Sequence, residues 1–340
     1  MFKIDSLPAK ICLGFSALMF FLYGISFMFF GDCYVMGGNG CFSLLNNGVP
    51  VEDVAYGRGG PETAFNGALF FGIFISTMLI LNEGARGKWV IMLPVIIGSA
   101  IMSICIWVYW NAESSAGDLP KYVSLLVTLV YTGAYILLRE EGINDGLSDF
   151  KPGLKINDKI AMVSLFLLVI SGLFYSLRMI FTPDNVISEG FPSDYTGPLD
   201  LDNGLGVPFP TTVSVSGSLI LIYTLFAALV LFDGASGKWT VLHPSAFAFM
   251  TVVISVFVGL IAGNARNASD QNQLDIMTGA LVMLLVLISY FTLKEEGVED
   301  DMTFGGVLQE DKGKFAIVLL LYALIMGALF SFNEILLPMF

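Results

Sequence analysis

Two short segments carry the residues whose types and spacing come closest to a chemical motif. Each places two glycines, a lysine and a tryptophan between long apolar runs. A loop that binds nucleotide phosphates needs four residues between its glycines and a Ser or Thr after its Lys, whereas here two residues intervene and Trp follows. We therefore predict structural hairpins, with lysines extending toward lipid headgroups and tryptophans at the membrane interface. The hairpin residues are Gly84, Gly87, Lys88, Trp89, Gly234, Gly237, Lys238 and Trp239.

Two pairs of carboxylates are the next candidates for chemistry. Glu140 and Glu141 end one apolar run, and Glu295 and Glu296 end another. At the ends of membrane spans we interpret these pairs as partners of the hairpin lysines that fix the order of the helices. Exposed ion pairs typically contribute about 0 to 1 kcal/mol, so they would set register more than stability.

The apolar runs contain no ionisable residue near their centres, and the chain has one histidine, His243. Proton relays and ion-coupled carriers place titratable groups at membrane depth, and metal or nucleophilic catalysis needs clustered ligands or a nucleophile with its base. We interpret His243 as a hydrogen-bonding residue near the interface rather than as a ligand. The sequence thus predicts no enzyme and no catalytic, cofactor-binding or metal-ligating residue.

Four cysteines divide between loops and apolar runs. Cys33 and Cys41 flank a glycine-rich stretch in a long polar connection, whereas Cys12 and Cys105 lie within apolar runs. No histidine accompanies the first pair, and a C-x-x-C spacing is absent, which disfavours a metal site. We predict a disulfide between Cys33 and Cys41, because an outer compartment permits oxidation.

The composition indicates which elements must position these residues. The chain is 56% hydrophobic and only 13% charged, with a mean hydropathy of +0.78, and this excludes an ordinary water-soluble globule. Nine apolar runs approach or reach the roughly 17 to 25 residues that a helix needs to cross a bilayer. The runs are 11–30, 64–81, 89–110, 122–138, 160–181, 213–232, 239–262, 276–293 and 315–332.

The order of these runs repeats with a period of about 150 residues. Besides the hairpins, Tyr23 and Tyr135 recur as Tyr175 and Tyr290 in matching surroundings. We predict an all-α integral membrane protein with two parallel four-helix transmembrane repeats and a ninth transmembrane helix. The first repeat would span 1–150, the second 151–306, and the ninth span with the C-terminus 307–340.

Basic residues predict the orientation. With the N-terminus in the cytoplasm, twelve of the sixteen basic residues lie inside and four outside, as the positive-inside rule requires. The C-terminus then lies outside. The 29 acidic residues divide almost evenly, so the outer face carries most of the net charge of -13. An acidic face repels nucleic acid, and we predict no nucleic-acid partner.

Two functions fit this architecture. The first is a non-catalytic scaffold or subunit of a membrane assembly, which works through its helix surfaces and acidic outer loops, with bound lipid and protein partners or further copies in the membrane. The second is a channel or facilitator for a small neutral solute, with a path between the two bundles lined by hydroxyl groups. The candidate hydroxyls of the first bundle are those of Ser76, Thr77, Ser99, Ser103, Ser124, Thr128 and Thr132.

Overall fold

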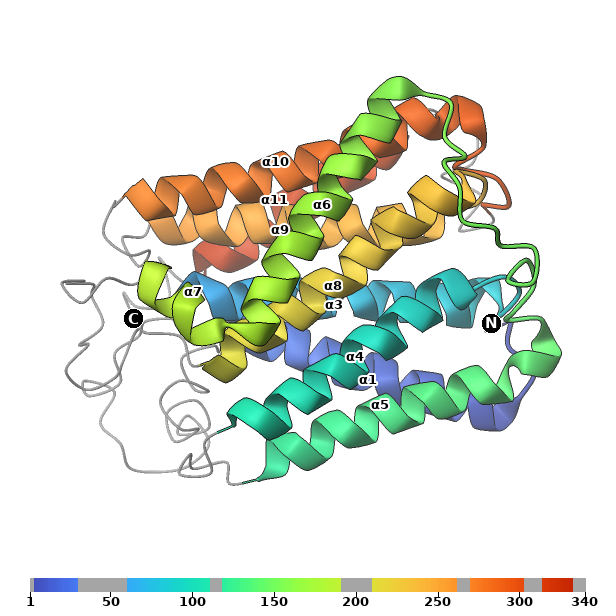
Figure 1. The fold of residues 1–340 in the computed structure, drawn as a ribbon, viewed down its shortest axis with the longest axis horizontal. Coiled ribbons are helices and arrows are strands. Elements are labelled where there is room, and N and C mark those ends of the chain that lie inside the picture. The colour runs from blue at the N-terminus through green and yellow to red at the C-terminus, as the bar shows by residue number, and fades with distance from the viewer. Residues whose placement is uncertain are drawn as a thin grey trace.

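The computed structural model describes residues 3–29, 60–110, 118–190, 210–261, 270–302 and 314–332. These residues form helices and connections, and none of them lies in a strand. The long helices run roughly along one direction and form an elongated bundle (Figure 1). The helices are α1 (Leu7–Phe29), α3 (Gly60–Glu83), α4 (Trp89–Tyr109), α5 (Leu119–Leu137), α6 (Lys159–Phe181), α7 (Pro183–Gly190), α8 (Pro210–Asp233), α9 (Trp239–Ile261), α10 (Asp270–Thr292) and α11 (Lys314–Ser331).

Nine of these helices in the described ranges are long and apolar enough to cross a membrane, in agreement with the nine predicted runs. The short helix α7 was not expected, because the connection after α6 shows no apolar periodicity. It begins with Pro183, whose missing N–H costs nothing in a first helical turn, and Asp184 follows near the helix N-terminus. Arg178 of α6 holds α7 in place through a bidentate pair with Glu189, at 2.7 and 2.6 Å.

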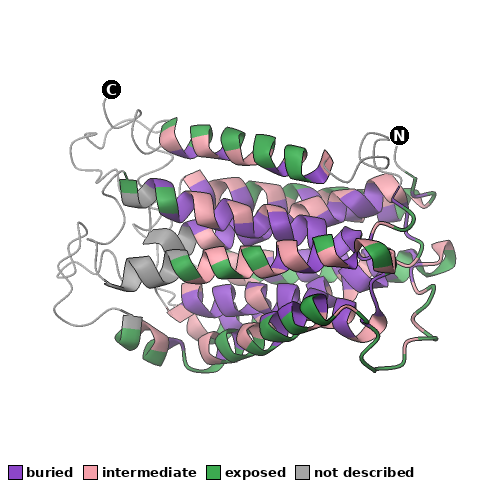
Figure 2. Ribbon diagram, turned by 90° about the horizontal axis from the view of Figure 1, so that it is seen from above, coloured by how far each residue is buried: buried purple, intermediate pink, exposed green. Residues whose placement is uncertain are grey.

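Four helices form the interior of the bundle. In α3, α4, α8 and α9, between 61% and 72% of the apolar span is buried, whereas in α1, α5, α6, α10 and α11 the share is 22% to 33%. Figure 2 shows the buried residues concentrated on the central helices, with exposed residues on the outer faces of the peripheral ones. The exposed side chains of the peripheral helices are largely Leu, Ile, Val and Phe, as a lipid environment requires.

The two halves of the chain interlock rather than form two self-contained bundles. The helices α3 and α4, which are joined by the first hairpin, contact each other little; α4 packs mainly on α8, and α3 packs on α1 and also on α9. Small residues allow the close approach: a Cβ added at Gly98 would lie 2.2 Å from Cγ1 of Ile222, and one at Gly72 would lie 2.8 Å from the Cβ of Ala248. These two contacts are reciprocal, since Ile222 and Ala248 stand 150 residues after Gly72 and Gly98.

The ninth spanning helix, α11, does not stand apart from the bundle. It packs along α9 with its outer face exposed, as Figure 2 shows for the helix that leads to the C-terminus. Tyr322 bonds to the hydroxyl of Thr251 and stacks on Phe71 of α3. At the far end Phe330 packs on Phe29 of α1. Aromatic side chains therefore attach α11 to both halves.

Candidate functional site: the hairpin end of the bundle

Both glycine hairpins lie at one end of the bundle, which we call the hairpin end. Gly87 and Gly237 each adopt a φ of +67°, a left-handed conformation that favours glycine. The N–H of Gly87 donates to the carbonyl oxygen of Gly142 at 2.9 Å, and that of Gly237 donates to Gly297 at 3.0 Å. Each hairpin is thus hydrogen-bonded to the connection that follows the fourth spanning helix of its own half, which is α5 in the first half and α10 in the second. These bonds join the two connections of each half at this end.

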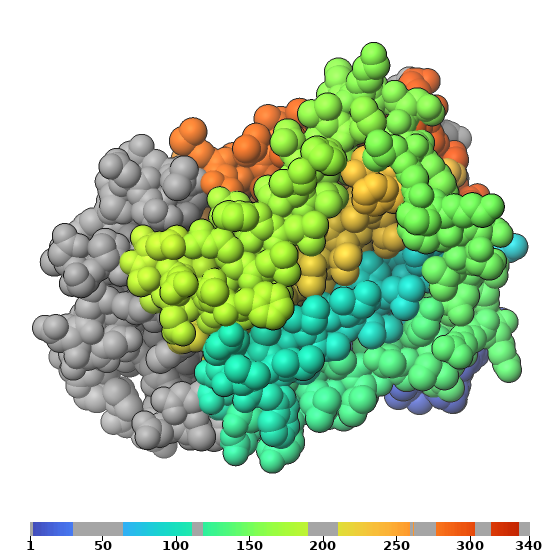
Figure 3. All heavy atoms as spheres, viewed as in Figure 1, coloured from blue at the N-terminus to red at the C-terminus, as the bar shows by residue number. Residues whose placement is uncertain are grey.

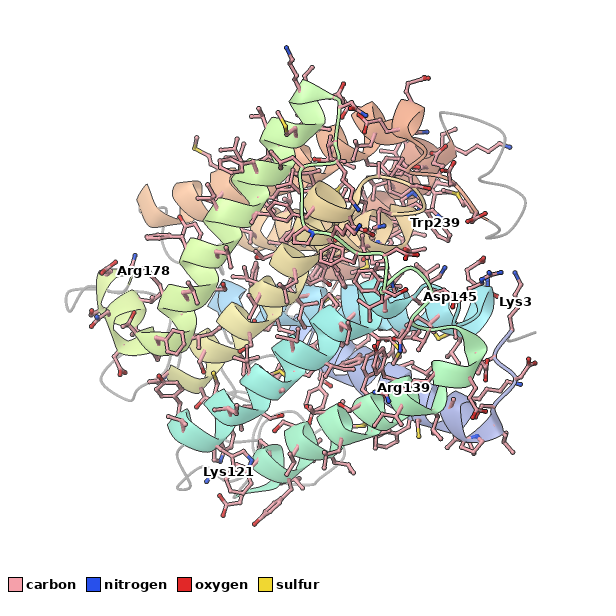
Figure 4. The ribbon with its side chains drawn as sticks, turned by 45° about the vertical axis from the view of Figure 1, so that its right-hand side comes forward. Lys3, Lys121, Arg139, Asp145, Arg178 and Trp239 are labelled. Carbon is pink, nitrogen blue, oxygen red and sulfur yellow. The ribbon has the colours of Figure 1, made fainter. Side chains whose placement is uncertain are left out.

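The two tryptophans are buried, which differs from the expected belt at the membrane interface. Trp89 is 4% exposed and Trp239 is 2% exposed. The indole N–H of Trp89 donates to the carbonyl oxygen of Asp145 at 3.1 Å, and that of Trp239 donates to Asp300 at 3.2 Å. Figure 4 shows Trp239 and Asp145 together with Lys3 at this end, and Lys121 and Arg178 at the other. The tryptophans act as internal braces because their N–H groups have protein partners within reach.

The hairpin lysines also differ from the expectation that they extend to lipid headgroups. The Nζ of Lys238 lies 2.8 Å from the carboxylate of Asp233, and the residue is only 8% exposed. Lys88 is half-buried; this burial lowers the pKa of its ammonium group, and the nearby Glu83 carboxylate offsets part of the shift. Neither lysine pairs with the glutamates at the span ends among the contacts of the described residues, because each has an acidic neighbour in its own hairpin.

Glu141 and Glu296 instead bind the backbone at the start of a helix. The carboxylate of Glu141 accepts the N–H groups of Asp5 and Ser6 at 3.0 and 2.7 Å, just before α1. Glu296 accepts the N–H groups of Asn157 and Asp158, just before α6. Such bonds satisfy donors that a helix start leaves without intrahelical partners, and a carboxylate there also complements the helix dipole. These carboxylates therefore tie the first helix of each half to the end of its fourth.

We expect Glu141→Ala to lower the free energy of unfolding by about 1 to 2 kcal/mol, which is the usual cost of losing a helix-capping side chain. Glu140→Ala is the matched control, because the adjacent Glu140 is exposed and its carboxylate accepts neither of these backbone N–H groups. The measurement is the midpoint of thermal unfolding of both variants in the same detergent. Equal midpoints for the two variants would contradict the capping role of Glu141.

His243 is buried among aromatic rings rather than placed for interfacial hydrogen bonding. Its ring stacks on Phe315 of α11 with 3.9 Å between centroids and packs edge-on against Tyr290 at 4.7 Å. Its Nε2 has no hydrogen-bond partner among the described residues. No sequence pattern predicts the contact between His243 and Phe315, because the sequence does not show that α9 and α11 are neighbours in the bundle.

Six of the seven hydroxyls of the predicted polar stripe form hydrogen bonds to groups of α3, α4 or α5. Thr128 bonds to Ser103 at 3.0 Å and also reaches the carbonyl oxygen of Ser99 at 3.2 Å, so these groups join α5 to α4. Ser76 and Thr77 bond to carbonyls one turn earlier in α3, at 3.1 and 2.9 Å. The hydroxyls of Ser124 and Thr132 also bond to carbonyls within their own helix, whereas the hydroxyl of Ser99 has no hydrogen-bond partner among the described residues. The structure therefore uses the stripe for packing within the first half of the chain.

Charged residues of the described helices stand only within about two turns of a helix end, a turn being about 3.6 residues. Among the described residues, no three His, Cys, Asp or Glu side chains are grouped so that they could hold a metal ion. Cys33 and Cys41 lie outside the described residues, so their disulfide stays a prediction. Cys12 and Cys105 are free thiols.

No protein-family model matches the chain, and neither a curated protein nor a solved structure matches it. The class of protein therefore rests on the fold. The described part of the chain is all-helical, with nine helices of spanning length and many large apolar side chains exposed on its outer surface. These features are compatible with a polytopic membrane protein.

Proposed function

We propose that this chain is a non-catalytic polytopic membrane protein that acts as a scaffold or subunit of a membrane assembly, through its helix surfaces and acidic outer loops. The observation that carries the proposal is how the interior is used. Hydroxyls join α4 to α5, glycines join α3 and α4 to the opposite half, and carboxylates cap helix starts. The polar groups of the spans thus support packing, which suits a rigid body that presents surfaces to partners.

We also propose that the body consists of two four-span units, 1–150 and 151–306, related by an approximate twofold axis parallel to the helices, with 307–340 as a separate ninth span and C-terminus. The reciprocal contacts at Gly98 and Gly72 support this arrangement. The matching bonds of Trp89 and Trp239, at the same end of the bundle, support it further. An interface of this kind is self-complementary, as in a twofold homodimer.

A cluster of exposed aromatic side chains at the end opposite the hairpins offers a surface for a partner. Trp107 is 47% exposed and Tyr122 is 59% exposed, and their rings meet edge to face at 5.8 Å. The ammonium group of Lys121 lies 5.7 Å from the centre of the Trp107 ring. Protein interfaces are enriched in aromatic residues, and aromatic residues also settle at membrane interfaces.

The alternative function is a channel or facilitator for a small neutral solute. One observation favours it: three buried hydroxyl groups, of Ser16, Ser99 and Tyr131, have no hydrogen-bond partner among the described residues, and all three lie in the first unit. A path between the two units has less support, because the glycine contacts close their interface at Gly98 and Gly72.

Reconstitution and native mass spectrometry separate the two functions. For a scaffold, we expect protein extracted gently from its membrane to carry a companion chain or further copies, and liposomes that contain it to show no flux of glycerol or urea and no proton-coupled uptake. Solute flux that is lost in Ser103→Leu or Thr128→Leu, but kept in Ser171→Leu, which changes a partly exposed serine of α6, would overturn the scaffold in favour of the channel.

The proposed orientation places the N-terminus and the hairpin end in the cytoplasm and the C-terminus outside, on the strength of the basic residues at the hairpin end. Single cysteines introduced near Asp145 or Asp301 should then resist an impermeant thiol reagent added to intact cells. Their modification from outside would reverse the orientation.

A further inference from the structure

A groove lies between α4 and α6, with α8 as its floor. At one end the walls meet, where Cys105, Ile180 and Leu221 form a buried cluster and the hydroxyl of Tyr109 donates to the carbonyl oxygen of Ile180 at 3.0 Å. The two walls diverge toward the hairpin end (Figure 1). Figure 3 shows α8, in yellow, recessed between the lime-green α6 and the teal α4. Four half-buried residues recur along one face of α8 at helical spacing: Leu225, Ala228, Leu229 and Phe232.

The equivalent face of the other half of the chain is covered by α11. There, α9 takes the place of α4, and each residue of α4 corresponds to the residue of α9 that stands 150 positions later in the sequence. Phe315 stacks on His243 and meets Phe247 edge to face, and Tyr322 contacts Phe247 and bonds to Thr251. On α4 the corresponding residues are Leu93, Ile97 and Ile101.

The groove at α4 lacks the aromatic rings and the hydroxyl that hold α11. Its wall is aliphatic, and Ile97 and Ile104 remain 46% and 62% exposed. Helix association in membranes relies on small residues and polar side chains at the contact. An aliphatic wall that offers neither suits flexible acyl chains better than a second helix like α11.

Three lysines stand in and at the end of the connection that enters the wall helix α6 at the hairpin end of this groove. Lys155 lies beside the end of the floor, with its Nζ 3.5 Å from the carboxylate of Asp233. Lys159 begins the wall helix α6, and Lys151 lies four residues before Lys155; both are exposed and have no ion pair among the described residues. Between the lysines Leu154 is 61% exposed. A leucine flanked by lysines is typical of backbone that lies at the boundary of headgroups and acyl chains.

Acidic groups near these lysines are mostly engaged. Within residues 149–159, the carboxylate of Asp158 accepts the N–H of Ala161 at 2.7 Å and caps α6, which leaves Asp149 as the exposed acid of the segment. Asp233 is shared between Lys155 and Lys238. In the other half of the chain the position that corresponds to Lys159 is Leu7, and Lys3 pairs with Glu83. The group of lysines within residues 151–159 is thus found beside the open groove and has no equivalent in the other half of the chain.

We propose that this groove binds a phospholipid with an anionic headgroup. The negatively charged headgroup lies at the hairpin end of the groove, near the lysines of residues 151–159, and the acyl chains lie along the aliphatic side chains of α4 and α8. Ammonium groups form charge-assisted hydrogen bonds with phosphate oxygens, and basic pockets between membrane helices are a recurring site for anionic lipids. The inference rests on insertion in a membrane and not on the scaffold function.

Native mass spectrometry tests the site with the full chain in mixed micelles that hold phosphatidylglycerol or phosphatidylcholine with the same acyl chains. We expect one tightly retained phosphatidylglycerol. Lys151→Gln combined with Lys159→Gln should weaken its binding about 30-fold, since each lysine near an anionic surface contributes a factor of about five. Ala228→Phe, which fills the floor of the groove, should reduce binding of both lipids.

The control variants make the same changes in charge and in side-chain size at positions outside the groove. Lys10→Gln with Arg139→Gln removes two charges at the hairpin end on α1 and after α5, and Leu129→Phe adds bulk on an exposed face of α5. Both should leave binding unchanged, and soluble glycerophosphate should not displace the lipid. The proposal would be overturned if the protein retained both lipids equally, or if the control variants lost as much lipid binding as the groove variants. Displacement of the lipid by glycerophosphate would also overturn it, as would finding a small membrane-spanning polypeptide bound instead of a lipid.

Discussion

Gly67→Ala should lower the free energy of unfolding by about 1 to 3 kcal/mol, although alanine favours helices. A Cβ at Gly67 of α3 would lie 2.7 Å from the carbonyl oxygen of Gly24 and from the backbone nitrogen of Met28, both in α1. Backbone atoms cannot rotate away as a side chain can, so the two helices must separate. Gly217 makes the same kind of contact between α8 and α6, 2.9 Å from the carbonyl oxygen of Ser176, and Gly217→Ala should cost a similar amount.

Two other glycines serve as matched controls for these variants. A Cβ added at Gly14 of α1 or Gly133 of α5 would meet nothing within 4 Å. Gly14→Ala and Gly133→Ala should therefore leave stability unchanged or raise it, since they add helix propensity without a clash. Thermal unfolding of all four variants in one detergent provides the comparison. If Gly67→Ala were as stable as Gly14→Ala, the close packing of α3 on α1 would be wrong.

Phe315→Ala should release α11 from the bundle. Phe315 is 3% exposed, stacks on His243 and also contacts Phe247 and Tyr290, so it fills the space at the hairpin end of the contact between α11 and α9. Removing a buried phenyl group costs about 3 to 5 kcal/mol in a protein core. Lipid can refill part of the space here, so we expect α11 to dissociate locally while the eight other spanning helices stay folded.

Cleavage followed by size-exclusion chromatography measures this release. A protease site placed within residues 303–313 separates the segment that contains α11 from the rest of the chain. After cleavage, the α11 fragment should co-elute with the bundle in the unchanged sequence and in Leu320→Ala, whose side chain is 60% exposed on the outer face of α11. It should elute separately in Phe315→Ala. Co-elution in all three proteins would show that Phe315 does not hold α11.

Sequence reasoning failed where residues were assigned to lipid headgroups. The Gly-Lys-Trp order of each hairpin predicts a turn with an interfacial Lys and Trp, and the turn glycines do adopt positive φ values. Trp89 and Trp239 are buried, however, because carbonyl groups of Asp145 and Asp300 lie within reach of their N–H groups. Those carbonyls belong to connections that follow in the sequence by more than 50 residues, and no local pattern shows that they return to the hairpin.

The sequence by itself determined the helical class and the number of helices long and apolar enough to span a membrane, since a run of apolar residues near 20 in length can satisfy its backbone in lipid only as a helix. The tertiary structure alone decided that α3 and α4 separate and pack across the two halves, that Glu141 and Glu296 cap distant helices, and that α11 covers α9 while the groove at α4 stays open. The physical reason is that span formation depends on local hydropathy. Helix packing depends on which small residues and side-chain shapes meet, and that is a property of pairs far apart in the chain.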